Sequence, residues 1–269
     1  MSLDPAALGE LERFARALIE DAGQLALDHF RRQPEVTDKS PAGAALDPVT
    51  AADRAVEARI REGIRARYPD HGLFGEEAED EPGASDFAWM IDPIDGTRGF
   101  MSGFVHWGAL LALRHRHEPV LGLVHQPYTG ETWSGAALGA HFYRGAEVAP
   151  MRTRDCGTLG AAVLATTDPY LFEGAEAAAF ESLRQQVRLT RYGADCYAYC
   201  MLAMGQLDLV VESGLKPWDV QALIPIIAAA GGVISNWRGG DCRDGGQVLA
   251  AGDAVLHRAA LARLAEAAN

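Results

Sequence analysis

Cysteine is scarce in this chain of 269 residues, which holds only Cys156, Cys196, Cys200 and Cys242. No two of them form a CxxC pair, and the spacing of Cys196 and Cys200 is that of one helical face. A disulfide framework or a cysteine zinc site usually shows several closely spaced pairs. We therefore expect reduced thiols and a cytoplasmic protein.

Long hydrophobic runs are also missing. No stretch reaches the roughly 18 apolar residues that are needed to cross a bilayer. The N-terminal stretch MSLDPAALGELERFARALIE has the spacing of an amphipathic helix and carries acids, unlike a signal or transit peptide. These features predict a protein that does not enter a membrane.

Basic residues are few, with 24 Lys and Arg against 37 Asp and Glu and a formal net charge of −13. Such a surface would repel nucleic acid and anionic lipid, because it cannot displace counterions from a row of phosphates. If the protein binds a phosphate, it must neutralise the charge locally. Metal ions are one means of doing so.

Apolar periodicity predicts helices at residues 5–31 and 49–67. A short strand is expected at HGLFGEE, and further strands separated by Gly and Pro predict an antiparallel meander. These strands are expected at residues 87–91, 107–115, 118–127, 131–136 and 140–144.

The second half of the chain alternates strands and helices, which predicts a sheet with helices on its faces. The expected strands are 161–167, 187–191, 207–212, 232–236 and 247–251, and the expected helices are 171–185, 194–205, 218–230 and 253–267. We therefore predict an α/β (α+β) protein with two layered halves. They are residues 1–150 and 151–269, joined at the polar segment near residues 145–160.

The stretch WMIDPIDGT places Asp92 and Asp95 directly after an apolar strand. A turn at this point lets both carboxylates and the carbonyl of Ile94 converge, and hard cations such as Mg²⁺ bind oxygen ligands of this kind. The backbone N–H groups of Gly96 and Thr97, at the start of a helix, would favour an anion. The alternative is that these acids only cap a helix.

Three more acids lie at junctions between strands and helices: Glu76 in GEE, Asp47 in LDPVTAAD and Asp219 in KPWDVQA. Each of them alone could be a helix cap or a solvated loop acid. Open α/β sheets, however, place their ligands at such junctions. Together with WMIDPIDGT, these motifs predict a site that holds metal ions and a phosphate.

The motifs GEE, WMIDPIDGT, DPVTAAD and WDVQA…AGG resemble those of the inositol monophosphatase family of metal-dependent phosphatases, over nearly the whole chain. The resemblance implies a layered αβαβα sandwich, usually a homodimer and often sensitive to lithium. It also implies that two or three Mg²⁺ ions act in the site. The ligands that it implies are Glu76, Asp92, the Ile94 carbonyl, Asp95 and Asp219.

The same resemblance implies that a metal-activated water attacks the phosphate, without a covalent nucleophile. Glu76, Thr97 and Asp47 then act on the attacking water, and the backbone N–H groups of Gly96 and Thr97 hold the phosphate. An aspartyl-phosphate mechanism would need a pattern such as DxDxT, which this chain lacks.

Within this family, the phrases DGTRGFMSG, YGADCYAYCMLA and LKPWDVQALIPII resemble the branch that hydrolyses L-histidinol phosphate. This substrate carries an amine and an imidazole, so its site needs carboxylates beyond the metal ligands. Asp195 and Glu212 are the candidates, through charge-assisted hydrogen bonds. Alternatively, Asp195 only caps the helix expected at 194–205, and Glu212 is only an acid at the end of a strand. Arg98 could bind the substrate phosphate, cross a subunit interface or lie on the surface.

Other activities remain open. The same fold could act on inositol phosphate or another small ester, and a non-catalytic metal-binding regulator would keep the fold without the reaction. A fructose bisphosphatase or sulfur-nucleotide phosphatase would need a basic cluster for a second phosphate, which we do not find. Lys39 could close over the site. His106, His125 and Trp107 fall on expected strands and are predicted to pack in the core.

Overall fold

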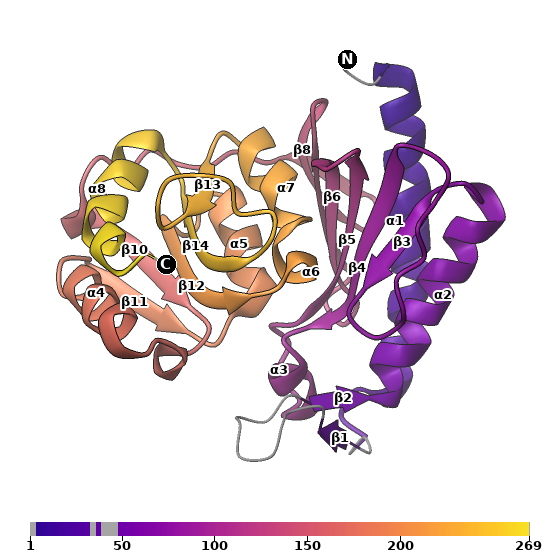
Figure 1. The fold of residues 1–269 in the computed structure, drawn as a ribbon, viewed down its shortest axis with the longest axis horizontal. Coiled ribbons are helices and arrows are strands. Elements are labelled where there is room, and N and C mark those ends of the chain that lie inside the picture. Colours follow the sequence, from indigo (N-terminus) through magenta and orange to yellow (C-terminus); the bar gives the residue numbers. More distant parts are fainter. Residues whose placement is uncertain (1–3, 33–35, 39–47, 269) are drawn as a thin grey trace.

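The computed structural model describes residues 4–32, 36–38 and 48–268. Two β-sheets alternate with three layers of helices, as Figure 1 shows from right to left. Buried apolar side chains fill the interface between each pair of neighbouring layers. The predicted αβαβα sandwich is therefore confirmed.

The larger sheet is an antiparallel meander with one parallel strand, β3, added at its edge. The neighbouring strands follow one another in sequence. Short turns join the last five of them, whereas residues 76–86 and 96–107 form longer connections between the first three. In order, they are β3 (Gly72–Gly75), β4 (Phe87–Asp95), β5 (Gly108–His115), β6 (Glu118–Gln126), β7 (Glu131–Ala136), β8 (Gly139–Arg144) and β9 (Glu147–Pro150).

Two long helices, α1 (Pro5–His29) and α2 (Ala51–Arg67), cover the outer face of this sheet. Their apolar stripes point toward the sheet and are buried there. Asp4 caps α1, and Thr50 and Asp53 form a capping box at the start of α2. Both helices confirm the sequence prediction.

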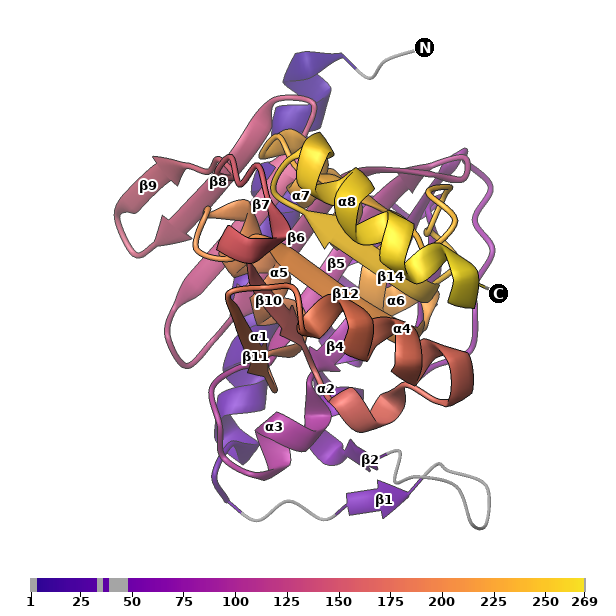
Figure 2. The same ribbon diagram turned by 90° about the vertical axis from the view of Figure 1, so that its left-hand side faces the viewer.

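The smaller sheet has the strand order β11-β10-β12-β14-β13, in which β10 is parallel to both of its neighbours. Figure 2 shows α4 and α8 over its outer face, while α5 and α7 pack between the two sheets. The strands are β10 (Val163–Thr166), β11 (Leu189–Tyr192), β12 (Leu209–Leu215), β13 (Val233–Asn236) and β14 (Gly246–Ala251).

The helices of the second half surround this sheet. They are α4 (Gly174–Arg184), α5 (Asp195–Ala203), α6 (Pro217–Val220), α7 (Leu223–Ala229) and α8 (Ala254–Leu264). The remaining elements are α3 (Thr97–Met101), the strand pair β1 (Val36–Asp38) and β2 (Pro48–Thr50), and three 3₁₀ turns at Leu159–Ala161, Pro169–Leu171 and Ala265–Ala267.

Several predicted boundaries were wrong. β4 does not stop before Asp92 but continues to Asp95. It does so through a bulge between Asp92 and Asp95, because Pro93 between them has no N–H group for the regular hydrogen-bond ladder. The helix expected at residues 218–230 is two short helices, α6 and α7. The second of them begins so that Pro225 falls within its first turn, where a missing N–H group is tolerated.

Two further segments also differ from the prediction. The helix expected at 171–185 begins only at Gly174, after a 3₁₀ turn, and β9 lies inside the segment that was predicted to be an irregular joint. The division of the chain into halves 1–150 and 151–269 stays a prediction. Within the described ranges, no helix has the length and apolar character to cross a membrane.

Candidate functional site

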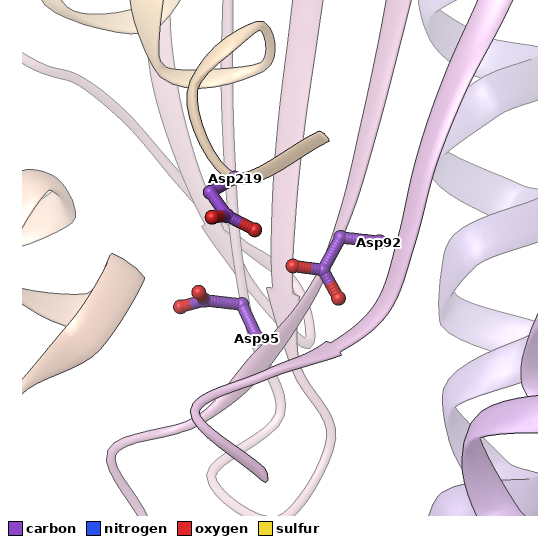
Figure 3. A group of neighbouring side chains, drawn as sticks. All are labelled: Asp92, Asp95 and Asp219. Carbon is purple, nitrogen blue, oxygen red and sulfur yellow. The ribbon is translucent and has the colours of Figure 1, made fainter. Parts of the chain in front are cut away.

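Three carboxylates meet between the larger sheet and the central helices. Asp92 and Asp95 come from the end of β4, and Asp219 comes from α6, which packs against β4. One oxygen from each lies within 4.8 Å of the others, and Figure 3 shows the three side chains grouped together. The bulge in β4 explains how Asp92 and Asp95, three positions apart, reach the same point.

This cluster is electrostatically strained. Burial, followed by the charges of Glu76, Asp95 and Asp219, raises the pKa of Asp92 well above its usual value. Burial and the neighbouring charge of Asp195 do the same to the pKa of Asp95. Burial also raises the pKa of Asp219 to about 6. A divalent cation would relieve this repulsion, and the all-oxygen donor set fits a hard ion such as Mg²⁺.

Glu76 lies next to the cluster, immediately after β3. Its backbone N–H donates to the carbonyl of Ile91 at 3.3 Å, which ties it to β4. It lines the same cavity as Asp95 and Asp219, and its charge acts on Asp92. The structure therefore places the fourth predicted acidic ligand, Glu76, beside the cluster, while the carboxylates within 4.8 Å of one another are those of Asp92, Asp95 and Asp219.

The turn after Asp95 has the conformation that the sequence suggested. Gly96 has φ +82°, which disfavours residues with a β-carbon, and α3 starts at Thr97. The Thr97 hydroxyl donates to the carbonyl of Ile94 at 3.0 Å, so the hydroxyl and the predicted carbonyl ligand are in direct contact. Phosphate binding by the N–H groups of Gly96 and Thr97 stays a prediction.

A cavity of about 690 Å³ opens beside the cluster. Its lining includes all three residues that were predicted to bind the substrate, namely Arg98, Asp195 and Glu212. Asp47 and Lys39 lie outside the described residues. Two acids of the cluster, Asp95 and Asp219, therefore line the same cavity as the further carboxylates of Asp195 and Glu212.

Glu212 lies at the inner wall of this cavity and is only 2% exposed. Its carboxylate accepts the backbone N–H of Thr167 at 2.7 Å and the hydroxyl of Thr166 at 3.3 Å. Burial raises its pKa to about 8. A positively charged ligand would favour the ionised form of this buried acid.

Asp195 is the first residue of α5, but its side chain does not cap that helix. Instead, the carboxylate of Asp95 accepts the backbone N–H of Cys196 at 2.6 Å. The start of α5 is thereby joined to the acidic cluster. The alternative role of Asp195, as a cap of this helix, is therefore wrong.

One residue near the site was missed by sequence reasoning. His106 was predicted to pack in the core, but it precedes β5 and its Nδ1 lies 3.2 Å from Oδ2 of Asp195. This hydrogen bond raises the pKa of His106. The two residues are 89 positions apart, so no local pattern could have indicated the contact. Trp107 and His125 are buried, as predicted.

Comparison with known proteins extends these observations. The sequence model of the inositol monophosphatase family matches residues 7–269. The bifunctional phosphatase IMPL2, chloroplastic, of Arabidopsis thaliana is 38% identical over 271 residues, covering 95% of this chain and 76% of that protein. The histidinol-phosphatase of Chlorobaculum parvum is 34% identical over 255 residues, covering 94% and 95%. A solved inositol monophosphatase from Zymomonas mobilis has a TM-score of 0.82 and 38% identity, covering 96% and 98%.

Proposed function

Because the chain belongs to the inositol monophosphatase family of metal-dependent phosphatases, we propose that it hydrolyses L-histidinol phosphate to L-histidinol and phosphate. The observation that carries this proposal is the pair of extra carboxylates, Asp195 and Glu212, in the cavity beside the acidic cluster. The name of one relative, the histidinol-phosphatase of Chlorobaculum parvum, supports it.

In this proposal, the acidic cluster holds Mg²⁺. The ligands would be the carboxylates of Glu76, Asp92, Asp95 and Asp219 and the carbonyl of Ile94, whose oxygen has a second lone pair beyond its bond to Thr97. Bound there, the metal would supply the positive charge that neutralises the phosphate and makes water a better nucleophile at neutral pH.

The chain's own groups would orient the reactants. The Thr97 hydroxyl donates its proton to the Ile94 carbonyl, so its oxygen is left to accept a hydrogen bond from the attacking water. Glu76 would take the proton of that water, and Asp47, together with Thr97, would help to position it. The N–H groups of Gly96 and Thr97, with the guanidinium of Arg98 at the cavity wall, would hold the phosphate.

The other end of the substrate determines the choice between esters. Histidinol phosphate carries an ammonium group, which would form charge-assisted hydrogen bonds with Asp195 and Glu212. Inositol and glycerol phosphates have no such cation and would gain less from these carboxylates. The two acids should therefore contribute to specificity more than to the reaction itself.

A substrate panel with Mg²⁺ tests the proposal. Wild-type protein should prefer histidinol phosphate over inositol 1-phosphate and glycerol phosphate, and it should complement a histidine auxotroph that lacks the phosphatase. Asp195→Asn should lower kcat/KM for histidinol phosphate by about tenfold or more, the usual size of a lost bond to a charged group. The same variant should keep kcat/KM for glycerol phosphate within about twofold of the wild-type value. Equal losses of kcat/KM for both esters would show that Asp195 does not bind the ammonium group of the substrate.

A second candidate is inositol 1-phosphate, because the solved inositol monophosphatase from Zymomonas mobilis is 38% identical to this chain. The same panel decides between the two candidates. If inositol 1-phosphate has the higher kcat/KM and Asp195→Asn has no selective effect, this second candidate holds and the first does not.

A further inference from the structure

His106 and Asp195 form a contact between the two sheet regions of the molecule, at the wall of the cavity. His106 lies between α3 and β5, and Asp195 begins α5. Nδ1 of the imidazole and Oδ2 of the carboxylate are 3.2 Å apart, which is within hydrogen-bond distance. The side chains are 29% and 16% exposed, so the contact is partly shielded from water.

The surroundings of His106 are shaped to hold its ring. A β-carbon on Gly99 would lie 2.9 Å from Cε1 of His106, so a larger residue at this place would displace the ring. On another side, the ring of Phe104 stacks against His106 with the ring centroids 5.4 Å apart. The imidazole is thus held by its neighbours rather than left to turn in solvent.

Asp195 adopts an uncommon backbone conformation, with φ +45°. Residues with a β-carbon rarely enter this region, and Gly193, two positions earlier, also has a positive φ of +77°. The next N–H group, that of Cys196, is bound by Asp95. The conformation therefore serves two purposes, since it joins α5 to the acidic cluster and directs the Asp195 carboxylate toward His106.

Only one carboxylate oxygen of Asp195 is engaged by this contact. Among residues 4–32, 36–38 and 48–268, Oδ2 is bonded to His106 and no hydrogen bond to Oδ1 is present. Asp195 also lines the cavity. Oδ2 is therefore held by His106, and Oδ1 is left for a ligand in the cavity.

We propose that His106 is a positioning residue that fixes the Asp195 carboxylate so that its second oxygen receives the cationic group of the substrate. This inference rests on the proposed function, because it requires an ammonium-bearing ester in the cavity. It makes His106 a determinant of specificity that acts through Asp195, without contact with the phosphate or the metal ligands.

The test compares His106→Leu, which has no hydrogen-bond donor, with His106→Asn, whose amide nitrogen can take the place of Nδ1. KM and kcat are measured with Mg²⁺ for histidinol phosphate and for glycerol phosphate. His106→Leu should raise KM for histidinol phosphate about tenfold and leave KM for glycerol phosphate within about twofold, with kcat little changed. His106→Asn should restore most of the affinity. His117→Leu, at an exposed histidine, is the matched control.

The double variant separates positioning from general damage. In the Asp195→Asn background, His106→Leu should have no further selective effect, since both changes remove the same interaction. If His106→Leu does not fold, His106→Ala takes its place in the same comparison. Equal KM changes for both esters in either variant would overturn the positioning role.

The outcomes also separate this inference from the function on which it rests. If Asp195→Asn discriminates between the esters and the His106 variants do not, only the role of His106 is wrong. If Asp195→Asn fails to discriminate, the amine site is wrong and the role of His106 falls with it.

Discussion

The guanidinium of Arg61 donates to the carboxylate of Glu57 across 2.8 Å, and both side chains are almost completely buried, at 2% and 1% exposure. The same carboxylate accepts the backbone N–H groups of Glu77 at 2.8 Å and Ala78 at 3.2 Å. A buried ion pair on α2 therefore holds the loop that directly follows Glu76. We infer that this pair positions Glu76 beside the acidic cluster.

Glu57→Gln should weaken Mg²⁺ binding and lower stability together. The amide keeps the shape of the side chain but cannot accept every N–H group that the carboxylate binds, and Arg61 keeps only the charge of Glu81, 3.1 Å away. The loss should be about 1.5–3 kcal/mol, the usual size of a lost hydrogen bond to a charged group. Removing a group that orients a metal ligand typically weakens metal affinity about 10-fold to 100-fold. Calorimetric titration with Mg²⁺ and urea denaturation measure the two effects.

Glu62→Gln is the matched control, because Glu62 lies on the same helix but is exposed. It should change neither the Mg²⁺ dissociation constant nor the free energy of unfolding. A Glu57→Gln protein that unfolds more easily yet binds Mg²⁺ as tightly as the wild type would show that the ion pair supports only the fold.

Asp95→Asn should abolish phosphatase activity while the protein stays folded. The variant removes one proposed metal ligand, and its amide oxygen can still accept the N–H of Cys196. Because the charge of Asp95 contributes to the raised pKa of Asp92, its removal should leave the chelator-treated protein as stable as the wild type or more stable. Turnover above about a tenth of the wild-type rate would contradict the metal assignment. Asp28→Asn, at an exposed position, is the control.

Stability of the metal-free protein should fall as pH rises from about 7 to about 8.5. Burial raises the pKa of Glu212 to about 8, whereas an unfolded chain would ionise this group at its usual lower pH. The folded state then binds more protons than the unfolded state, so each pH unit costs up to about 1.4 kcal/mol per such carboxyl group. Asp92 and Asp95, whose pKa values are also raised, act in the same direction.

Urea denaturation with a chelator across this pH range measures the effect. The range lies above the titration of His125, whose burial lowers its pKa to about 4 and would give the opposite slope at acidic pH. Glu212→Gln should flatten the curve, and saturating Mg²⁺ should flatten the part that comes from the acidic cluster. A chelated protein whose stability increases with pH in this range would contradict the prediction.

The sequence allowed much of the fold to be predicted, since its strongest signals are periodic. The stripes of α1 and α2 and the meander of the larger sheet follow from regular alternation of apolar residues. The break between α6 and α7 could not be read in the same way. The apolar run continues across it, and only the position of Pro225 indicates where the second helix can start.

The site was predictable to the extent that its acids occupy short, specific motifs. Asp92, Asp95 and Asp219 were singled out from local sequence, and the structure brings them together. Residues that act from a distance carry no such signal. Glu57 and Arg61 are four positions apart and look like an ordinary surface ion pair on a helix, because their burial depends on the loop that folds over them.

The central helices also approach the larger sheet closely enough to require glycine. A β-carbon on Gly122, in β6, would lie 1.9 Å from the carbonyl oxygen of Ala222. One on Gly135, in β7, would lie 2.2 Å from Cα of Ile226. These contacts involve backbone, which cannot turn aside as a side chain can. They hold α7 on the sheet, and α6 with Asp219 directly precedes it.

Gly122→Ala should therefore weaken both the fold and the metal site. The added methyl group must push the backbone at Ala222 away from β6, and overpacking of this kind typically costs about 1–3 kcal/mol of unfolding free energy. The shift would also move Asp219 from Asp92 and Asp95, so the Mg²⁺ dissociation constant should rise. Gly157→Ala, where the methyl group meets nothing within 4 Å, is the control and should be neutral. Urea denaturation and Mg²⁺ titration that find Gly122→Ala equal to the wild type would show that the two layers have room to separate without disturbing the acidic cluster.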